Sequence, residues 1–286
     1  MMPVNNNIRP ATGQIARKEN HAMRNTILFI LVAVLAMGAL ISCGNGEEAA
    51  APTGYAPDQT VEAYAYVHGG YVGQAVVTTD AEGNIDATID EAFLPHTLAH
   101  VDIESDEWNE DNTVTYVVRG ETNYVARWVA YNGTNFVGNT VGTSLVYVPA
   151  DDSGNPATEV NQNILEKTII RNEANMEAWF TSITDGSFQV FTEYGGDPMT
   201  VSETPYGGLT KRNSEYWNFG LGWEGNMEEI QAAAEEYGVG YTLDDMSRDP
   251  DEGIWSLADA TTGATASDFP DYFALIQQAV ARLEMQ

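Results

Sequence analysis

Residues shortly before the C-terminus carry groups that suit a phosphate ester. They read Asp259-Ala260-Thr261-Thr262-Gly263-Ala264-Thr265, which is the pattern D-x-x-T-G-A-T. The hydroxyl of Thr265 could be esterified, and Gly263 has no Cβ to obstruct a close approach of the backbone. Ala264 is the next smallest choice. A helix that begins just after this segment would offer unpaired N–H groups and its dipole to a phosphate.

The sequence predicts such a helix after Thr265. Ser267 is a suitable N-cap, Asp268 suits the first turn, and Pro270 is tolerated there. Apolar residues then recur at spacings of four, three, four and three, at Phe269, Phe273, Ile276, Val280 and Leu283. This spacing is typical of an amphipathic helix with one apolar face.

The segment closely resembles the flavinylation motif of the FMN-binding domain family, which has a member in the sodium-pumping NADH:quinone reductase. The resemblance implies that a flavin transferase joins FMN covalently to Thr265 through its phosphate. It also implies that Asp259, Thr262, Gly263 and Ala264 are needed to recognise the transferase or to seat the phosphate. The alternative is a Gly-containing loop that only caps the last helix.

A shorter resemblance to the same family covers residues 64–89. Apolar and aromatic residues alternate there around Gly69 and Gly70, and residues 80–84 form a turn signal before a second alternating run at 85–89. This pattern predicts a β-hairpin. Further strands are expected at Thr113–Val118, Tyr124–Val129, Ser144–Val148 and Ser187–Glu193, with turns at residues 120–123 and 185–186.

Two more helices are expected. Apolar residues at helical spacing predict a long helix over residues 156–183, covering a sheet. Asn226 and Glu229 look like a capping box that starts a second helix, with Gly238 as its stop. The expected fold is therefore α+β: an antiparallel sheet packed by a few helices, FMN-binding-domain-like, with an insertion or second subdomain between the two resembling regions. Residues 61–286 form this domain, with a possible break near 150–157.

A basic and aromatic segment could contact the flavin. Lys211 and Arg212 form an adjacent pair that could neutralise the phosphate or the anionic ring, or could lie in a solvated loop. Four aromatic residues could stack on the ring or belong to the core: Tyr216, Trp217, Trp223 and Trp255. Trp255 is the preferred candidate because it lies just before Asp259.

Two other motifs are weaker. Residues 220–225 match G-x-G-x-x-G, but no parallel βαβ unit is evident. His96 and His100 have a metal-compatible spacing, with Asp102 and Glu104 nearby, but no Cys or H-E-x-x-H supports a metal site, and we expect none. No Ser/His/Asp arrangement stands out for hydrolysis.

The N-terminal region predicts export. Residues 23–26 precede an apolar run at residues 27–41 that fits a signal peptide better than a membrane span. The run leads into Cys43, the single cysteine, in a context that resembles a bacterial lipobox. We expect Cys43 to be lipidated and to anchor the chain in a bilayer; the alternative is a buried Cys in an N-terminal membrane helix.

Residues 1–42 are thus expected to be a signal peptide with an N-terminal extension. Met23 is the expected start, with residues 1–22 arising from an upstream start codon; alternatively, Arg17 and Lys18 extend the basic end of the signal peptide. Residues 43–60 are rich in Gly, Ala, Pro and Glu and read as a flexible tether. The expected location is the extracytoplasmic face of a bacterial cell envelope.

Charge excludes some functions. The chain has 42 acidic and 12 Lys and Arg residues, a net charge of −30. Such a surface repels phosphate backbones, so nucleic-acid binding is not expected. A lone cysteine excludes disulfides, c-type haem and Cys-ligated iron–sulfur clusters.

The resulting hypothesis is a lipid-anchored flavoprotein that takes electrons from a membrane donor. We expect an electron carrier rather than a stand-alone enzyme. The alternatives are a binding lipoprotein that holds flavin or another ligand without electron transfer and, less favoured, a reductase with a specific terminal acceptor.

Overall fold

The structure is a computed structural model and describes residues 54–200, 209–214 and 216–286. The expected signal peptide, Cys43 and residues 43–53 of the expected tether lie outside these ranges. Within the described ranges, no helix is both long enough and apolar enough to cross a membrane.

The first sheet is an antiparallel meander of β1 (Thr60–Val67), β2 (Tyr71–Thr79) and β3 (Ile85–Phe93). Its second turn consists of residues 80–84, as predicted. Asp80 Oδ1 accepts hydrogen bonds there from the backbone N–H groups of Glu82 and Asn84. The hairpin prediction is confirmed. The Gly pair forms an additional turn, in which Gly69 has a φ of +78° that favours glycine.

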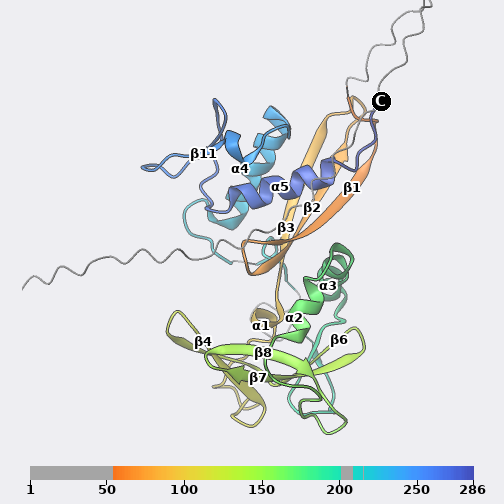
Figure 1. Cartoon of the computed structure of the whole chain (residues 1–286), viewed down its shortest axis with the longest axis vertical. Coiled ribbons are helices and arrows are strands. Elements are labelled where there is room, and N and C mark those ends of the chain that lie inside the picture. The colour runs from red at the N-terminus through yellow and green to blue at the C-terminus, as the bar shows by residue number, and fades with distance from the viewer. Residues whose placement is uncertain (1–53, 201–208, 215) are drawn as a thin grey trace, which may run out of the picture. The chain divides into compact units, whose positions relative to one another are not determined.

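Helices α4 (Gly222–Tyr237) and α5 (Phe269–Val280) cover one face of this sheet (Figure 1). All five apolar residues predicted to share one face of the last helix are buried, although Leu283 lies just beyond the end of α5. The helix prediction is confirmed except at its start, because Asp268 rather than Ser267 occupies the N-cap position. The start of α5 therefore lies shortly after Thr265.

The opposite face of the sheet belongs to a second hydrophobic cluster. Tyr64 and Val72 of the sheet are part of it, together with Trp179 and Phe180 of α3 (Glu173–Asp185). Trp179 is fully buried and donates a hydrogen bond from Nε1 to the Phe93 carbonyl oxygen at 3.0 Å. The meander thus has apolar partners on both faces.

The rest of this second cluster comes from the central part of the chain. A five-stranded antiparallel sheet has the order β10-β9-β6-β7-β8, and β4 and β5 form a separate hairpin. The bounds are α1 (Pro95–Leu98), β4 (Thr113–Val118), β5 (Glu121–Ala126), β6 (Trp128–Tyr131), β7 (Thr134–Val141), β8 (Ser144–Pro149), α2 (Ile164–Ile169), β9 (Gln189–Phe191) and β10 (Met199–Thr200).

A small antiparallel sheet carries the residues before Thr265. It consists of β11 (Met246–Arg248), β12 (Trp255–Leu257) and β13 (Ala260–Thr261), preceded by the 3-10 turn η2 (Leu243–Asp245). Asp259 lies in the tight turn between β12 and β13. Every paired strand in the described ranges runs antiparallel to its neighbour, and helices pack on the sheets, so the α+β class is confirmed.

The single long helix predicted over residues 156–183 is wrong. The chain forms α2 and α3 instead, and residues 156–163 are not helical. Asn163 caps α2 by accepting from Glu166 N–H, and Asn172 caps α3 by accepting from Asn175 N–H. Asparagine favours such caps over helix interiors, while the apolar periodicity continues because both helices bury residues in the same cluster.

Other boundaries also differ from the prediction. The expected capping box at Asn226 is wrong, because α4 begins at Gly222 and Asn226 lies buried inside it; Gly238 does end that helix. The expected strand at 124–129 is divided at Arg127 between β5 and β6, and residues 121–123 belong to β5 rather than to a turn. Strand β7 was not predicted.

The expected insertion or second subdomain, between residues 89 and 259, stays a prediction. The possible break near 150–157 stays a prediction, and Tyr147 and Leu165, from either side of it, lie in the same hydrophobic cluster.

Candidate functional site

A buried asparagine fixes the loop that contains Thr265. Asn226 Oδ1 accepts hydrogen bonds from the N–H groups of Thr265 and Ala266, both at 2.7 Å, and from the Thr265 hydroxyl at 3.2 Å. Asn226 Nδ2 donates to the Gly222 carbonyl oxygen at 2.7 Å, so the amide itself is held in place. The Thr265 side chain is half-buried, and its hydroxyl is therefore positioned by α4.

The other motif residues shape the same loop. Thr262 is buried; its hydroxyl donates to the Trp255 carbonyl oxygen at 2.9 Å and accepts from Ala264 N–H at 3.2 Å. Ala264 is fully buried. Gly263 faces α4 so closely that an added Cβ would lie 2.1 Å from Glu229 Oε2. Small residues at these two positions therefore have a packing reason of their own.

Trp255 supports the loop from the other side. Its Nε1 donates to the Ala266 carbonyl oxygen at 2.7 Å, and its ring stacks on Phe269 with centroids 5.3 Å apart. One ring face is thus already used within the protein. Arg248 Nη2 donates to the Thr265 carbonyl oxygen at 2.9 Å, which places a guanidinium group next to Thr265. Asp259, by contrast, is exposed in its turn.

A cavity of about 350 Å³ opens beside this loop. Its wall includes the three residues that follow Thr265, namely Ala266, Ser267 and Asp268. The remaining wall is aromatic and basic, and consists of His68, Tyr71, Arg119, Lys211, Tyr216, Trp217, Trp223 and Tyr272. Its volume lies in the range of roughly 300–1,000 Å³ that is usual for small-molecule sites.

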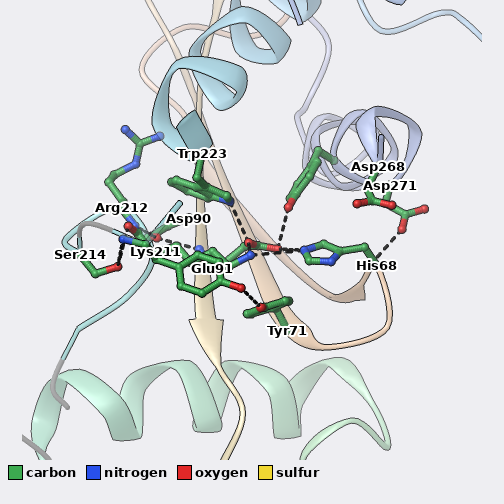
Figure 2. A network of polar contacts seen from close by, with 12 residues as sticks. His68, Tyr71, Asp90, Glu91, Lys211, Arg212, Ser214, Trp223, Asp268 and Asp271 are labelled. Carbon is green, nitrogen blue, oxygen red and sulfur yellow. Dashed lines mark hydrogen bonds and ion pairs between the residues drawn. The ribbon is translucent and has the colours of Figure 1, made fainter. Parts of the chain in front are cut away.

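Glu91 is the centre of a polar network behind this wall (Figure 2). Its side chain is fully buried and accepts from Lys211 Nζ at 2.5 Å, Trp223 Nε1 at 2.8 Å, His68 Nε2 at 2.9 Å and the Tyr272 hydroxyl at 3.0 Å. Four donors from four separate parts of the chain therefore converge on one carboxylate. Such convergence satisfies a charge that would otherwise be costly to bury.

These contacts shift the ionisation of the network. Burial alone would raise the pKa of Glu91, but the hydrogen bond from His68 and the charge of Lys211 hold that pKa below its ordinary value. Burial lowers the pKa of Lys211, and the neighbouring Glu91 opposes this effect. Burial and the Glu91 charge together raise the pKa of Tyr272 above its ordinary value. We conclude that Glu91 is ionised and paired with Lys211.

The structure separates the roles of the basic pair. Lys211 is only 4% exposed and lines the cavity, so a solvated loop is the wrong description for it. Its ammonium group lies 3.4 Å from the centroid of the Tyr71 ring. Arg212 instead donates from Nε and Nη2 to the Ile89 carbonyl oxygen, at 3.0 and 2.7 Å, and supports β3.

The aromatic candidates also divide. Trp223 belongs to the core, as its burial and its bond to Glu91 show, yet one edge reaches the cavity. Trp217 is 44% exposed at the cavity wall, and the Tyr216 hydroxyl forms a hydrogen bond with the Tyr71 hydroxyl at 2.7 Å. Trp255 does not line this cavity.

Sequence reasoning missed Glu91, His68 and the role of Asn226. The alternation read in residues 85–89 continues inward as Ala87, Ile89 and Glu91, so an acidic residue at a core-facing strand position was the available signal. In α4, Asn226 likewise occupies an inward position one turn before Ile230. No sequence pattern marks His68, which lies in the turn between β1 and β2.

A second cavity, of about 380 Å³, lies between the β4–β5 hairpin and β7. Its wall includes Arg127, whose Nε is buried without a hydrogen-bond partner. No residue is common to the two cavities, and of these two only the first is lined by the residues that follow Thr265. We therefore regard the first as the candidate site.

The two weaker motifs gain no support. Gly222 is the first residue of α4, and Gly220 lies just before it. The described strands pair antiparallel and provide no parallel βαβ unit. In the part of the chain that the structure describes, no group of three or more His, Cys, Asp or Glu residues could hold a metal ion. Burial lowers the pKa of His96 to about 4.

Comparisons with known proteins give no relative from which function could be transferred. No family model, no curated protein and no solved structure matches the chain.

Proposed function

We propose that the chain is an extracytoplasmic flavoprotein that carries FMN as a phosphate ester on Thr265 and takes part in electron transfer. The observation that carries this proposal is the position of the Thr265 hydroxyl. It is fixed by Asn226 in a loop that borders a cavity of about 350 Å³ with aromatic and basic walls. The family resemblance of residues 259–265 supplies the chemistry of attachment.

The residues present suit the parts of FMN. Arg248, beside Thr265, could neutralise an esterified phosphate, because a guanidinium binds phosphate oxygens in a fixed geometry. Tyr216 and Trp217 offer aromatic surface for a planar ring, and Lys211 offers positive charge. When bound, a flavin supplies one- and two-electron chemistry, while the protein supplies position and electrostatics.

The FMN-binding-domain-like fold and the extracytoplasmic location of the chain are part of the same proposal. An FMN-binding-domain-like fold is supported by the meander of β1 to β3 packed by α4 and α5, with Thr265 next to α5. The proposed signal peptide, the lipid on Cys43 and the docking to a membrane electron donor rest on the sequence of residues 23–60. A tether of this kind would raise the local concentration of membrane partners.

The test is covalent flavin incorporation. The full chain would be expressed in a bacterium with a flavin transferase, and the intact mass would be measured after denaturation. We expect an FMN-sized increment that is lost in Thr265→Ala and kept in Thr261→Ala, a matched control because Thr261 is an exposed threonine in the same segment. With the transferase active on a control substrate, absence of the increment would remove the covalent proposal.

The second candidate is a binding lipoprotein that holds flavin or another ligand without electron transfer. The cavity itself favours it, because a built pocket needs no ester to bind a ligand. In that case flavin would leave the protein on denaturation, whereas an ester-linked flavin would remain.

A further inference from the structure

The cavity beside Thr265 has a cation held against an aromatic surface. Lys211 Nζ is 2.5 Å from Glu91 and lies over the Tyr71 ring, with the Tyr216 ring centroid 4.9 Å away (Figure 2). The side chains of Lys211 and Glu91 are 3% and 0% exposed. Lys211 Nζ also lies 3.5 Å from His68 Nε2, and Lys211 forms part of the cavity wall.

This position is unusual for a lysine in so acidic a chain. Only eight Lys and Arg residues follow residue 42, against 41 acidic residues. Two of the eight, Lys211 and Arg119, line this one cavity, and His68 lines it as well. Burial of a lysine costs free energy unless its charge has a partner, and Glu91 is that partner here. The concentration of basic groups at one cavity of so acidic a chain points to a ligand-facing role as well.

The walls favour a flat ligand. Aromatic rings from β2, from the residues before α4 and from α5 border the cavity: Tyr71, Tyr216, Trp217 and Tyr272. Trp217 lies at the cavity wall, is 44% exposed, and has a positive φ of 52°, which is uncommon outside glycine. Aromatic surfaces bind planar rings by stacking.

We propose that this cavity is a non-covalent site for a planar heteroaromatic ring with an acidic imide or enolate edge, and that Lys211, positioned by Glu91, is the residue that recognises this edge. A flavin isoalloxazine ring belongs to this class. The identification of flavin as the natural ligand rests on the proposed function; the site itself does not require the ester at Thr265.

The chemistry of the wall separates this class from simple anions. Phosphate and carboxylate groups are compact and strongly hydrated, and removing that hydration is costly. A delocalised ring presents apolar faces to the tyrosines and the tryptophan while its polar edge meets the single ammonium group.

The experiment uses the full chain with Thr265→Ala and free riboflavin, which has no phosphate. Binding is followed by quenching of riboflavin fluorescence. We expect saturable binding that Lys211→Met weakens roughly 10- to 100-fold, as for loss of a charged hydrogen bond. Lys211→Arg should restore part of the affinity, and Lys167→Met, which changes an exposed lysine, should leave it unchanged.

Three further measurements follow, of which the first guards against misfolding. Lys211→Met combined with Glu91→Gln removes both charges of the pair, and it should fold and still bind weakly. Trp217→Ala, at an exposed position, should weaken binding about tenfold through lost stacking. Phenazine is a neutral tricycle without an acidic edge. It should bind the Thr265→Ala chain equally well with Lys211 present and with Lys211→Met.

The outcomes separate this inference from the proposed function. The inference is overturned, even if Thr265 is flavinylated, by either of two results. One is absence of riboflavin binding, and the other is equal riboflavin affinity of the Lys211→Met chain and the chain that keeps Lys211. Riboflavin binding that depends on Lys211 supports it even if no transferase modifies Thr265. Stronger binding of inorganic phosphate than of riboflavin would also overturn it.

Discussion

Replacement of Glu91 by Gln should be among the most destabilising conservative changes in the described chain. Glutamine has nearly the same size, but it carries no charge and turns one acceptor into a donor. Lys211 would then be buried without its counter-charge, and the four donors would compete for one carbonyl oxygen. Removing one partner of a buried ion pair costs about 3–5 kcal/mol.

The measurement is urea unfolding at pH 7, followed by tryptophan fluorescence. A loss of about 3–5 kcal/mol corresponds to a fall in Tm of roughly 6–20 °C for a domain of this size. Glu224→Gln is the matched control. Glu224 also faces an arginine, at 3.7 Å from Arg212, but its side chain is 62% exposed. We expect that control to change the free energy of unfolding by less than about 0.5 kcal/mol.

The pH dependence provides an independent check. The pKa of Glu91 is lower in the folded state than its ordinary value, so the unfolded chain takes up a proton first as the pH falls. The stabilisation from Glu91 is therefore present above the unfolded pKa of about 4.3 and is lost as the pH falls through the folded pKa. The difference between wild type and Glu91→Gln should shrink over that acidic window.

A small effect would refute this reasoning. If Glu91→Gln and Glu224→Gln had equal effects at pH 7, the Glu91 network would add no net stability, and its role in positioning Lys211 would lose its physical basis.

Three further predictions concern separate groups. Asn226→Ala leaves the buried Ala266 N–H and the partly buried Thr265 N–H without an acceptor. It should reduce the free energy of unfolding by about 2–4 kcal/mol in urea titration. It should also slow flavin attachment, and unchanged attachment would contradict its positioning role. Gly263→Ala should reduce the free energy of unfolding by less than about 1 kcal/mol, because the flexible Glu229 side chain can move away. It should nevertheless block flavin attachment. Normal attachment would show that Gly263 is needed only for packing. Burial lowers the pKa of His96 to about 4. The wild-type free energy of unfolding should therefore fall by roughly 2–3 kcal/mol between pH 7 and pH 4, a loss that His96→Gln does not show. Identical pH profiles of stability would argue against burial of His96 as the cause.

Local patterns predicted the elements that frame the site. The apolar face of α5 follows directly from spacings of four and three, because burial of one helix face requires them. The alternation around residues 64–89 predicted a hairpin for the equivalent reason in strands, and the structure adds a further strand beyond a turn at the Gly pair. Predictions of helix boundaries failed where an asparagine could either cap a helix or lie inside one. Asn163 and Asn172 each begin a helix inside the predicted long one, whereas Asn226, predicted as a cap, lies within a helix.

The sequence by itself determined the composition of the candidate site: a hydroxyl at Thr265, small residues before it, and an amphipathic helix after it. Only the tertiary structure decided what surrounds that hydroxyl. Asn226 lies 39 residues before Thr265, and Lys211 lies 120 residues after Glu91. Asn226 and Thr265 meet because α4 and α5 pack on the same face of the meander. Lys211 meets Glu91 because its segment runs beside β3, where the Lys211 N–H donates to the Glu91 carbonyl oxygen at 2.8 Å. No local periodicity encodes that packing, since it arises from the burial of several distant apolar faces at once.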